Sequence, residues 1–97
     1  MKPVRFLPIA REELLDAMLD YESRAPHLGT SFLLRLEQAV ESVREHPAAW
    51  PQLRPGIRHK LLPRFPYAVI YREDPDEIVV LAVMHMHRRP EYWKDRS

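Results

Sequence analysis

Apolar residues recur with the 3.6-residue period of an α-helix in residues 9–25 and 27–46, the long proline-free parts of the chain. The apolar positions are Leu14, Ala17, Met18 and Tyr21 in the first part, and Phe32, Leu36, Ala39, Val40 and Val43 in the second. The first stripe predicts an amphipathic helix from about residue 9 to residue 23. The second predicts a longer helix with Pro26 at its first position and an end at His46-Pro47. Because the break between them is short, the helices should form an antiparallel hairpin.

From residue 57 onward the apolar positions alternate with a period of two, which is typical of β-strands with one buried face. The expected strands cover residues 57–62, 67–72 and 78–85. Asp74-Pro75-Asp76 supplies turn residues before the last strand, which must therefore run antiparallel to the strand before it. Residues 4–7 have the composition of a short strand, and the flanking prolines favour a position near a sheet edge.

The resulting element order is β-α-α-β-β-β, and the predicted fold class is α+β. A helical hairpin packed on one face of a mostly antiparallel sheet would bury the apolar stripes of both kinds of element. The 97 residues fit a single domain, residues 1–97, and an apolar content of 45% supports a packed core. Such a two-layer fold leaves one sheet or helix face uncovered, which is a typical docking surface for a partner.

Composition excludes several classes of function. Without cysteine, the chain has no disulfide, thiolate metal site or thiol nucleophile, and we expect a cytoplasmic protein. The longest apolar run, Ile78 to Met84, is far shorter than the ~20 residues of a membrane-spanning helix. No export signal is visible, so we expect no membrane partner. A net charge of +1 excludes a histone-like affinity for nucleic acid, although residues 46–97 carry nine Lys and Arg against six Asp and Glu.

This basic half contains a set of residues that could bind phosphate. They are Arg58, Lys60, Arg72, His85, His87, Arg88, Arg89, Tyr92 and Lys94. Such residues can hold a phosphate or stabilise a phosphorane-like transition state, or they can be solvated charges on an open sheet face. His85 and His87 lack the further ligands that a metal site needs, so we expect neither a metal nor a cofactor. Trp50 and Trp93 stand at element boundaries, which favours lids on the core over platforms for base stacking.

Three segments of the second half together resemble a known family. They read FPYAVIY from Phe65 to Tyr71, IVVLAVMH from Ile78 to His85, and HRRPEYWKDR from His87 to Arg96. The first half adds an Ala-x-x-Glu-Leu helix start at Ala10 to Leu14. Over nearly its whole length the sequence resembles the RelE/ParE superfamily of toxins from bacterial type II toxin-antitoxin systems. The resemblance implies the β-α-α-β-β-β fold, a toxic activity, and neutralisation by a small antitoxin that wraps around the toxin, with a higher-order assembly of the two left open.

The superfamily has one branch that acts by binding. ParE-like members bind DNA gyrase, and for this branch we expect Arg88, Arg89, Tyr92 and Trp93 to contact the target. Arginine and aromatic side chains of this kind usually dominate protein interfaces. The chain lacks the lysine richness and strong basicity common among the ribosome-dependent nucleases, which favours the ParE-like branch.

The other branch acts by chemistry. RelE-like members cleave messenger RNA on the ribosome, and this chain would then be a metal-independent endoribonuclease. The expected roles are proton transfer by Lys60 or His85, charge stabilisation by Arg58, Arg72 and Arg88, and substrate positioning by Tyr92. A third alternative, from a different class, is a nontoxic remnant that only binds its antitoxin.

Overall fold

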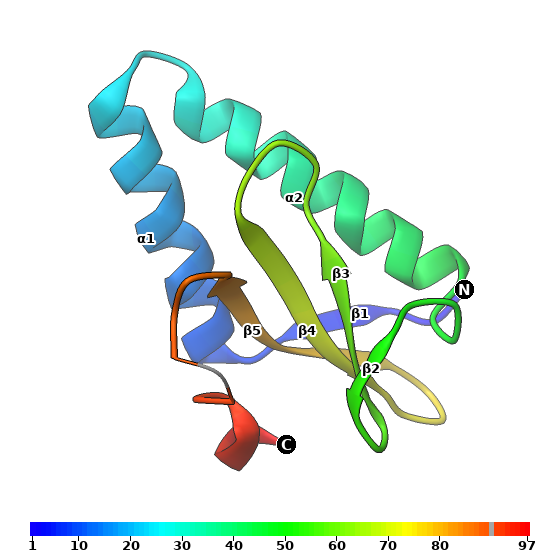
Figure 1. The fold of residues 1–97 in the computed structure, drawn as a ribbon. Coiled ribbons are helices and arrows are strands. Elements are labelled where there is room, and N and C mark those ends of the chain that lie inside the picture. Colours follow the sequence, from blue (N-terminus) through cyan, green and yellow to red (C-terminus); the bar gives the residue numbers. More distant parts are fainter. Residues whose placement is uncertain (90) are drawn as a thin grey trace.

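The computed structural model describes residues 1–89 and 91–97. Over these residues the elements are, in chain order, β1 (Val4–Phe6), α1 (Pro8–Arg24), α2 (Leu28–Glu45), β2 (Gln52–Arg54), β3 (Ile57–Leu61), β4 (Tyr67–Glu73), β5 (Ile78–His85) and the short 3₁₀ helix η1 (Lys94–Arg96). The sheet order is β1-β5-β4-β3-β2, with β1 parallel to β5 and the other neighbouring pairs antiparallel. α1 and α2 form a V-shaped hairpin on one face of the sheet (Figure 1). The predicted fold class and helical hairpin are confirmed.

The turn between the helices differs from the prediction. Pro26 is not the first helical residue, because His27 adopts a left-handed backbone with φ of 70° and α2 begins at Leu28. The side chain of Glu22, at the end of α1, accepts hydrogen bonds from the backbone nitrogens of His27 at 2.9 Å and Gly29 at 3.0 Å. This carboxylate therefore caps the amino end of α2 from the preceding helix. No helix in the described part of the chain is both long and apolar enough to cross a membrane.

The strands predicted by alternation are confirmed as β3, β4 and β5, and the turn at Asp74 is closed by a hydrogen bond from its nitrogen to the oxygen of Glu77. β1 lies at the sheet edge, as its flanking prolines predict. Strand β2 was not predicted, because Gln52–Arg54 is exposed and has no apolar alternation. Gly56, with φ of 79°, makes the tight turn that brings β2 back against β3.

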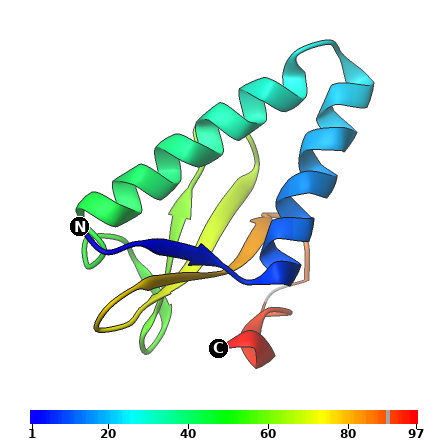
Figure 2. The ribbon, with the colours of Figure 1, turned by 180° about the vertical axis from the view of Figure 1, so that it is seen from behind.

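The main core lies between the sheet and the helices. Figure 2 shows these two layers from behind. Phe32 of α2 stacks on Tyr21 of α1 with ring centroids 5.4 Å apart, and meets Tyr67 of β4 edge-on at 5.0 Å. Val69 and Val80 fill the layer below these rings. The apolar stripes found in the sequence are therefore the surfaces that meet in the core.

The second face of the sheet has a smaller core of its own. A β-bulge in β5 opposite Ile70 adds one residue, so that Leu81 and Ala82 both belong to the core on this face. Trp93, 1% exposed, packs against them from the C-terminal segment, which we define as residues 86–89 and 91–97. The expectation of an uncovered sheet face is therefore wrong for this region, because the C-terminal segment folds back over it.

Candidate functional site

The cations predicted as a phosphate-binding cluster lie on different faces of the sheet. Arg58 and Lys60 stand opposite Tyr71 and Val69, whose side chains pack toward the helices. Arg72 stands opposite Ile57, which belongs to the core on the second face. The sequence interpretation grouped these residues because neighbouring predicted strands carry them. The strand register separates them.

Each of these three cations already contacts another residue of the chain. Arg58 donates a hydrogen bond of 2.7 Å to the carbonyl oxygen of Trp50, and the Lys60 ammonium lies 3.9 Å from the centroid of the Trp50 ring. Arg72 forms a bidentate pair with Asp74 at 2.8 and 3.2 Å. The hydrogen bond from Arg72 holds the pKa of the Asp74 carboxyl below its usual value. Arg58, Lys60 and Arg72 therefore do not share one phosphate-sized site.

His85 ends β5 on the helix-facing side, where its ring centroid lies 5.0 Å from that of Tyr67. Its Nδ1 accepts a hydrogen bond of 3.0 Å from the nitrogen of His87. β4 lies between His85 and Lys60, and their partners on β4, Tyr67 and Val69, are two residues apart, so the backbones of the two proton-transfer candidates are more than about 10 Å apart. Among the described residues, no group of three His, Asp or Glu side chains could hold a metal ion, although the rings of His85 and His87 are 5.2 Å apart.

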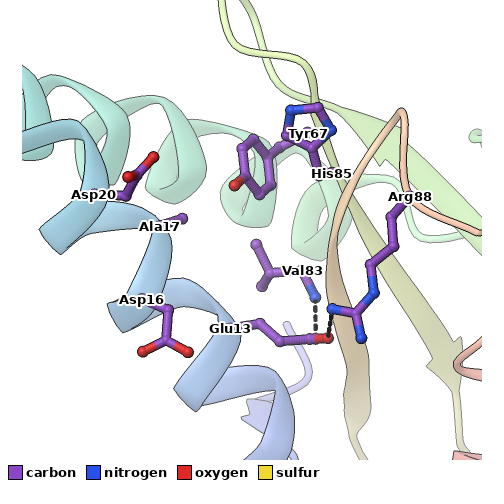
Figure 3. A pocket seen from close by; sticks show the side chains of 8 residues that line it. All are labelled: Glu13, Asp16, Ala17, Asp20, Tyr67, Val83, His85 and Arg88. Atoms are coloured by element: carbon purple, nitrogen blue, oxygen red, sulfur yellow. Dashed lines mark hydrogen bonds and ion pairs between the residues drawn. The ribbon is translucent and has the colours of Figure 1, made fainter. Parts of the chain in front are cut away.

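The polar residues that do converge meet at Glu13 on α1. Its Oε2 accepts a hydrogen bond of 2.8 Å from the Tyr92 hydroxyl and lies 3.5 Å from a nitrogen of Arg88. Arg96 binds both carboxylate oxygens, at 2.9 and 3.2 Å. The nitrogen of Val83 donates to Oε1 at 3.1 Å. Figure 3 shows Glu13 reaching from α1 toward Val83 of β5 and Arg88. These three residues line part of a pocket of about 230 Å³.

Tyr92 is held in one protonation state by these neighbours. Burial, followed by its hydrogen bond to Glu13, raises the pKa of the Tyr92 hydroxyl far above its usual value. The guanidinium carbon atoms of Arg88 and Arg96 lie 3.8 and 4.9 Å from the centroid of its ring. In this setting the Tyr92 phenol donates a hydrogen bond to Glu13 and stacks with two cations.

A separate apolar groove of about 410 Å³ lies between α2 and the edge strand β1. Its apolar lining comes from Pro3, Val4, Phe6, Leu14, Leu33, Leu36 and Val40, and its polar lining from Glu37, Glu41 and Arg44. Because β1 pairs only with β5 in the described sheet, its outer edge faces this side of the molecule. The groove and the C-terminal segment are distinct surfaces.

Comparison with known families decides the branch. A family model described as the ParE toxin of the type II toxin-antitoxin system, parDE, matches residues 4–90. The chain belongs to the ParE toxin family. A solved structure titled as the chromosomal ParDE TA system from P. aeruginosa has a similar fold, with a TM-score of 0.63, 22% identity, and coverage of 90% of this chain and 98% of that one. No curated protein matches the chain. The resemblance to the RelE/ParE superfamily is confirmed, and its ParE branch is the one that matches.

Within this ParE-family toxin, the expected target-binding residues differ in exposure. Arg88 and Arg89 are exposed and Tyr92 is half-buried. Trp93 is only 1% exposed, so it supports the segment from inside and does not offer a surface to a target. That part of the prediction is wrong, while the prediction of Trp93 as a lid on the core is confirmed. The proline of the family-like ending, Pro90, lies outside the described residues.

Sequence reasoning missed Glu13 and Arg96 as parts of this polar cluster. The available signal was the Ala-x-x-Glu-Leu motif, in which Ala10 is fully buried and Leu14 packs against the main core. Glu13 stands between these apolar positions, with a side chain only 12% exposed. A charged residue at a position facing the protein interior indicates a buried partner of opposite charge.

Proposed function

We propose that this ParE-family toxin inhibits DNA gyrase by binding it and performs no chemistry of its own. The observation that carries the proposal is the separation of the residues that a RelE-like nuclease would need. Such a nuclease requires a base, an acid and cations around one phosphate. Lys60 and His85 have β4 between them, and Arg72 lies on the other face, paired with Asp74.

The C-terminal segment is the proposed contact surface for gyrase. Arg88 has a side chain that is 53% exposed, and its guanidinium carbon lies 3.8 Å from the centroid of the Tyr92 ring. Arg89 is exposed beside it and lines a surface pocket together with Glu91, Tyr92, Lys94 and Asp95. Arginine and tyrosine on a folded support are the residue types that most often carry binding energy at interfaces.

A cognate antitoxin is the proposed partner for the groove between α2 and β1. The groove is mainly apolar, and β1 offers the outer edge of a sheet, so it suits an amphipathic helix or an added strand from a partner. The similar P. aeruginosa structure is of a ParDE toxin-antitoxin system. A toxin that meets gyrase on bacterial DNA must work in the cytoplasm, and the absence of cysteine suits that compartment.

The test is induction of the chain in bacterial cells without antitoxin. Wild type should cause filamentation and a DNA-damage response while protein synthesis continues at first. Lys60→Ala and His85→Ala should stay toxic, whereas Arg88→Ala should weaken toxicity by about the 2 kcal/mol of binding that loss of one interface anchor costs. Arg35→Ala, a change on the far helix α2, is the matched control.

Two results would contradict the proposal. Translational arrest within minutes, abolished by Lys60→Ala or His85→Ala, would identify a ribosome-dependent nuclease, because loss of an acid or base costs about 10² to 10⁴-fold in rate. Normal growth with abundant wild-type protein would identify a nontoxic remnant.

A further inference from the structure

We propose that Glu13 is the positioning residue of the gyrase-binding surface, which it holds in shape without touching the target. This inference rests on the proposed function. Glu13 is 12% exposed and belongs to α1, whereas the residues it binds come from β5 and the C-terminal segment. Its carboxylate is thus the point where three separate parts of the chain are joined.

The contacts of Glu13 lie along the part of β5 that extends beyond the end of β1. β1 ends at Phe6, opposite Val80, while β5 continues to His85. Beyond that point the backbone nitrogen of Val83 binds Glu13, and the carbonyl oxygen of Leu81 accepts a hydrogen bond of 3.0 Å from Arg96. The Glu13–Arg96 pair therefore satisfies the edge of β5 in place of a strand, and Arg96 anchors the C-terminal segment there.

The Glu13 carboxylate also holds the side chains of Tyr92 and Arg88 in position. Glu13 Oε2 accepts a hydrogen bond from the Tyr92 hydroxyl and lies 3.5 Å from a nitrogen of Arg88. The Arg88 guanidinium in turn contacts the Tyr92 ring. The arginine side chain has several rotatable bonds, and ordering it only at the moment of binding would weaken binding. A carboxylate that orders this side chain beforehand increases affinity for the target while remaining out of its reach.

The charge of Glu13 is matched by its surroundings. Arg88 and Arg96 bring two positive charges to one carboxylate, and Tyr92 adds a hydroxyl donor. Glutamine has nearly the same shape, but its amide nitrogen is a donor that would face these donors. Glu13→Gln should therefore loosen the C-terminal segment and keep the α1 backbone and the groove between α2 and β1 intact.

The experiment compares Glu13→Gln with Glu12→Gln, an exposed neighbour on the same helix. Three properties are measured for each purified protein: inhibition of gyrase supercoiling, affinity for the antitoxin, and hydrogen exchange of residues 91–97. Glu13→Gln should need at least about tenfold more toxin for half-inhibition, bind antitoxin within about twofold of wild type, and exchange faster in residues 91–97. Glu12→Gln should match wild type in all three.

A double variant distinguishes a positioning role of Glu13 from a purely structural role. Because Glu13 orders Arg88 as well as Tyr92, the loss of gyrase inhibition in Glu13→Gln combined with Arg88→Ala should be clearly smaller than the two single losses multiplied together. Additive losses, or a parallel fall in antitoxin affinity, would overturn the inference by showing a merely structural role. Unchanged inhibition by Glu13→Gln would overturn it too. Failure of wild type to inhibit gyrase is a distinct result, which removes the proposed function and the inference together.

Discussion

The carboxylate of Glu13 and the guanidinium of Arg96 lie 2.9 Å apart although 83 residues separate them in the chain. Their side chains are 12% and 14% exposed, so the pair is largely shielded from solvent. This contact ties the end of the chain to the first helix. The C-terminal segment is therefore a part of the fold that covers the second face of the sheet.

Arg96→Ala should lower the free energy of unfolding by about 3 kcal/mol, because it leaves the shielded Glu13 carboxylate without its closest cation. Urea denaturation measures the change. Arg24→Ala is the control, since its pair with Asp20 is more than half exposed and should contribute less than about 1 kcal/mol. Equal effects of both substitutions would show that the Glu13–Arg96 contact has no special role in stability.

Gly29→Ala should destabilise the helical hairpin. A β-carbon at this position would lie 2.6 Å from the backbone oxygen of Met18 and 3.1 Å from the β-carbon of Glu22, so α1 and α2 would have to separate. Overpacking of this kind costs about 1 to 3 kcal/mol. Thermal unfolding provides the measurement, with the exposed Thr30→Ala as the neighbouring control. A stability equal to wild type would mean that the helices can move apart without loss.

Alkaline pH should destabilise the fold through Tyr71. Burial raises the pKa of its hydroxyl to about 12, from 10 in an exposed tyrosine. The unfolded chain loses the proton first, so the contribution of Tyr71 to stability is complete below pH 10 and disappears as the pH rises from 10 to about 12.

Tyr71→Phe should flatten this alkaline decline. At neutral pH it should also cost about 1 kcal/mol, because the Tyr71 hydroxyl donates a hydrogen bond to the carbonyl oxygen of Pro47. Part of the decline should remain, since burial also raises the pKa of Tyr21, Tyr67 and Tyr92. The measurement is urea denaturation at several pH values up to 11. A decline as steep as in wild type would rule out Tyr71 as its source.

The groove between α2 and β1 gives a prediction about the antitoxin. Val40→Glu places a charge in its apolar lining and should weaken antitoxin binding by about 30-fold or more, which corresponds to the 2 kcal/mol expected at an interface anchor. Co-purification and calorimetry with the antitoxin measure this loss. Leu34→Glu, at an exposed position of α2 outside the groove lining, should bind normally. If only Leu34→Glu loses the antitoxin, the docking surface lies on another face.

Most of the fold could be predicted from the sequence because its elements are amphipathic. The stripe that contains Phe32 and Leu36 and the alternation through Val69 both mark buried surfaces, and buried surfaces leave a periodic pattern. β2 could not be found in this way, since all three of its residues are exposed and none marks a buried face. Its pairing is fixed by the turn at Gly56.

The candidate site was less predictable than the fold. Arg58 and Arg72 seemed to belong together because neighbouring strands carry them, and only the register shows that they lie on opposite faces. Glu13 and Arg96 have no local pattern that connects them, because a contact across 83 residues depends on the whole fold. The sequence left two roles for Trp93, a lid on the core and a contact with the target. Its burial excludes the second role.

The measurement that tests the account most directly is inhibition of DNA gyrase supercoiling by the purified toxin. Wild type should block supercoiling at micromolar concentration or below, Lys60→Ala and His85→Ala should block it equally well, and addition of the antitoxin should restore it. Arg88→Ala should be clearly weaker. Full supercoiling activity in the presence of excess toxin, together with cleavage of messenger RNA on translating ribosomes, would contradict the account.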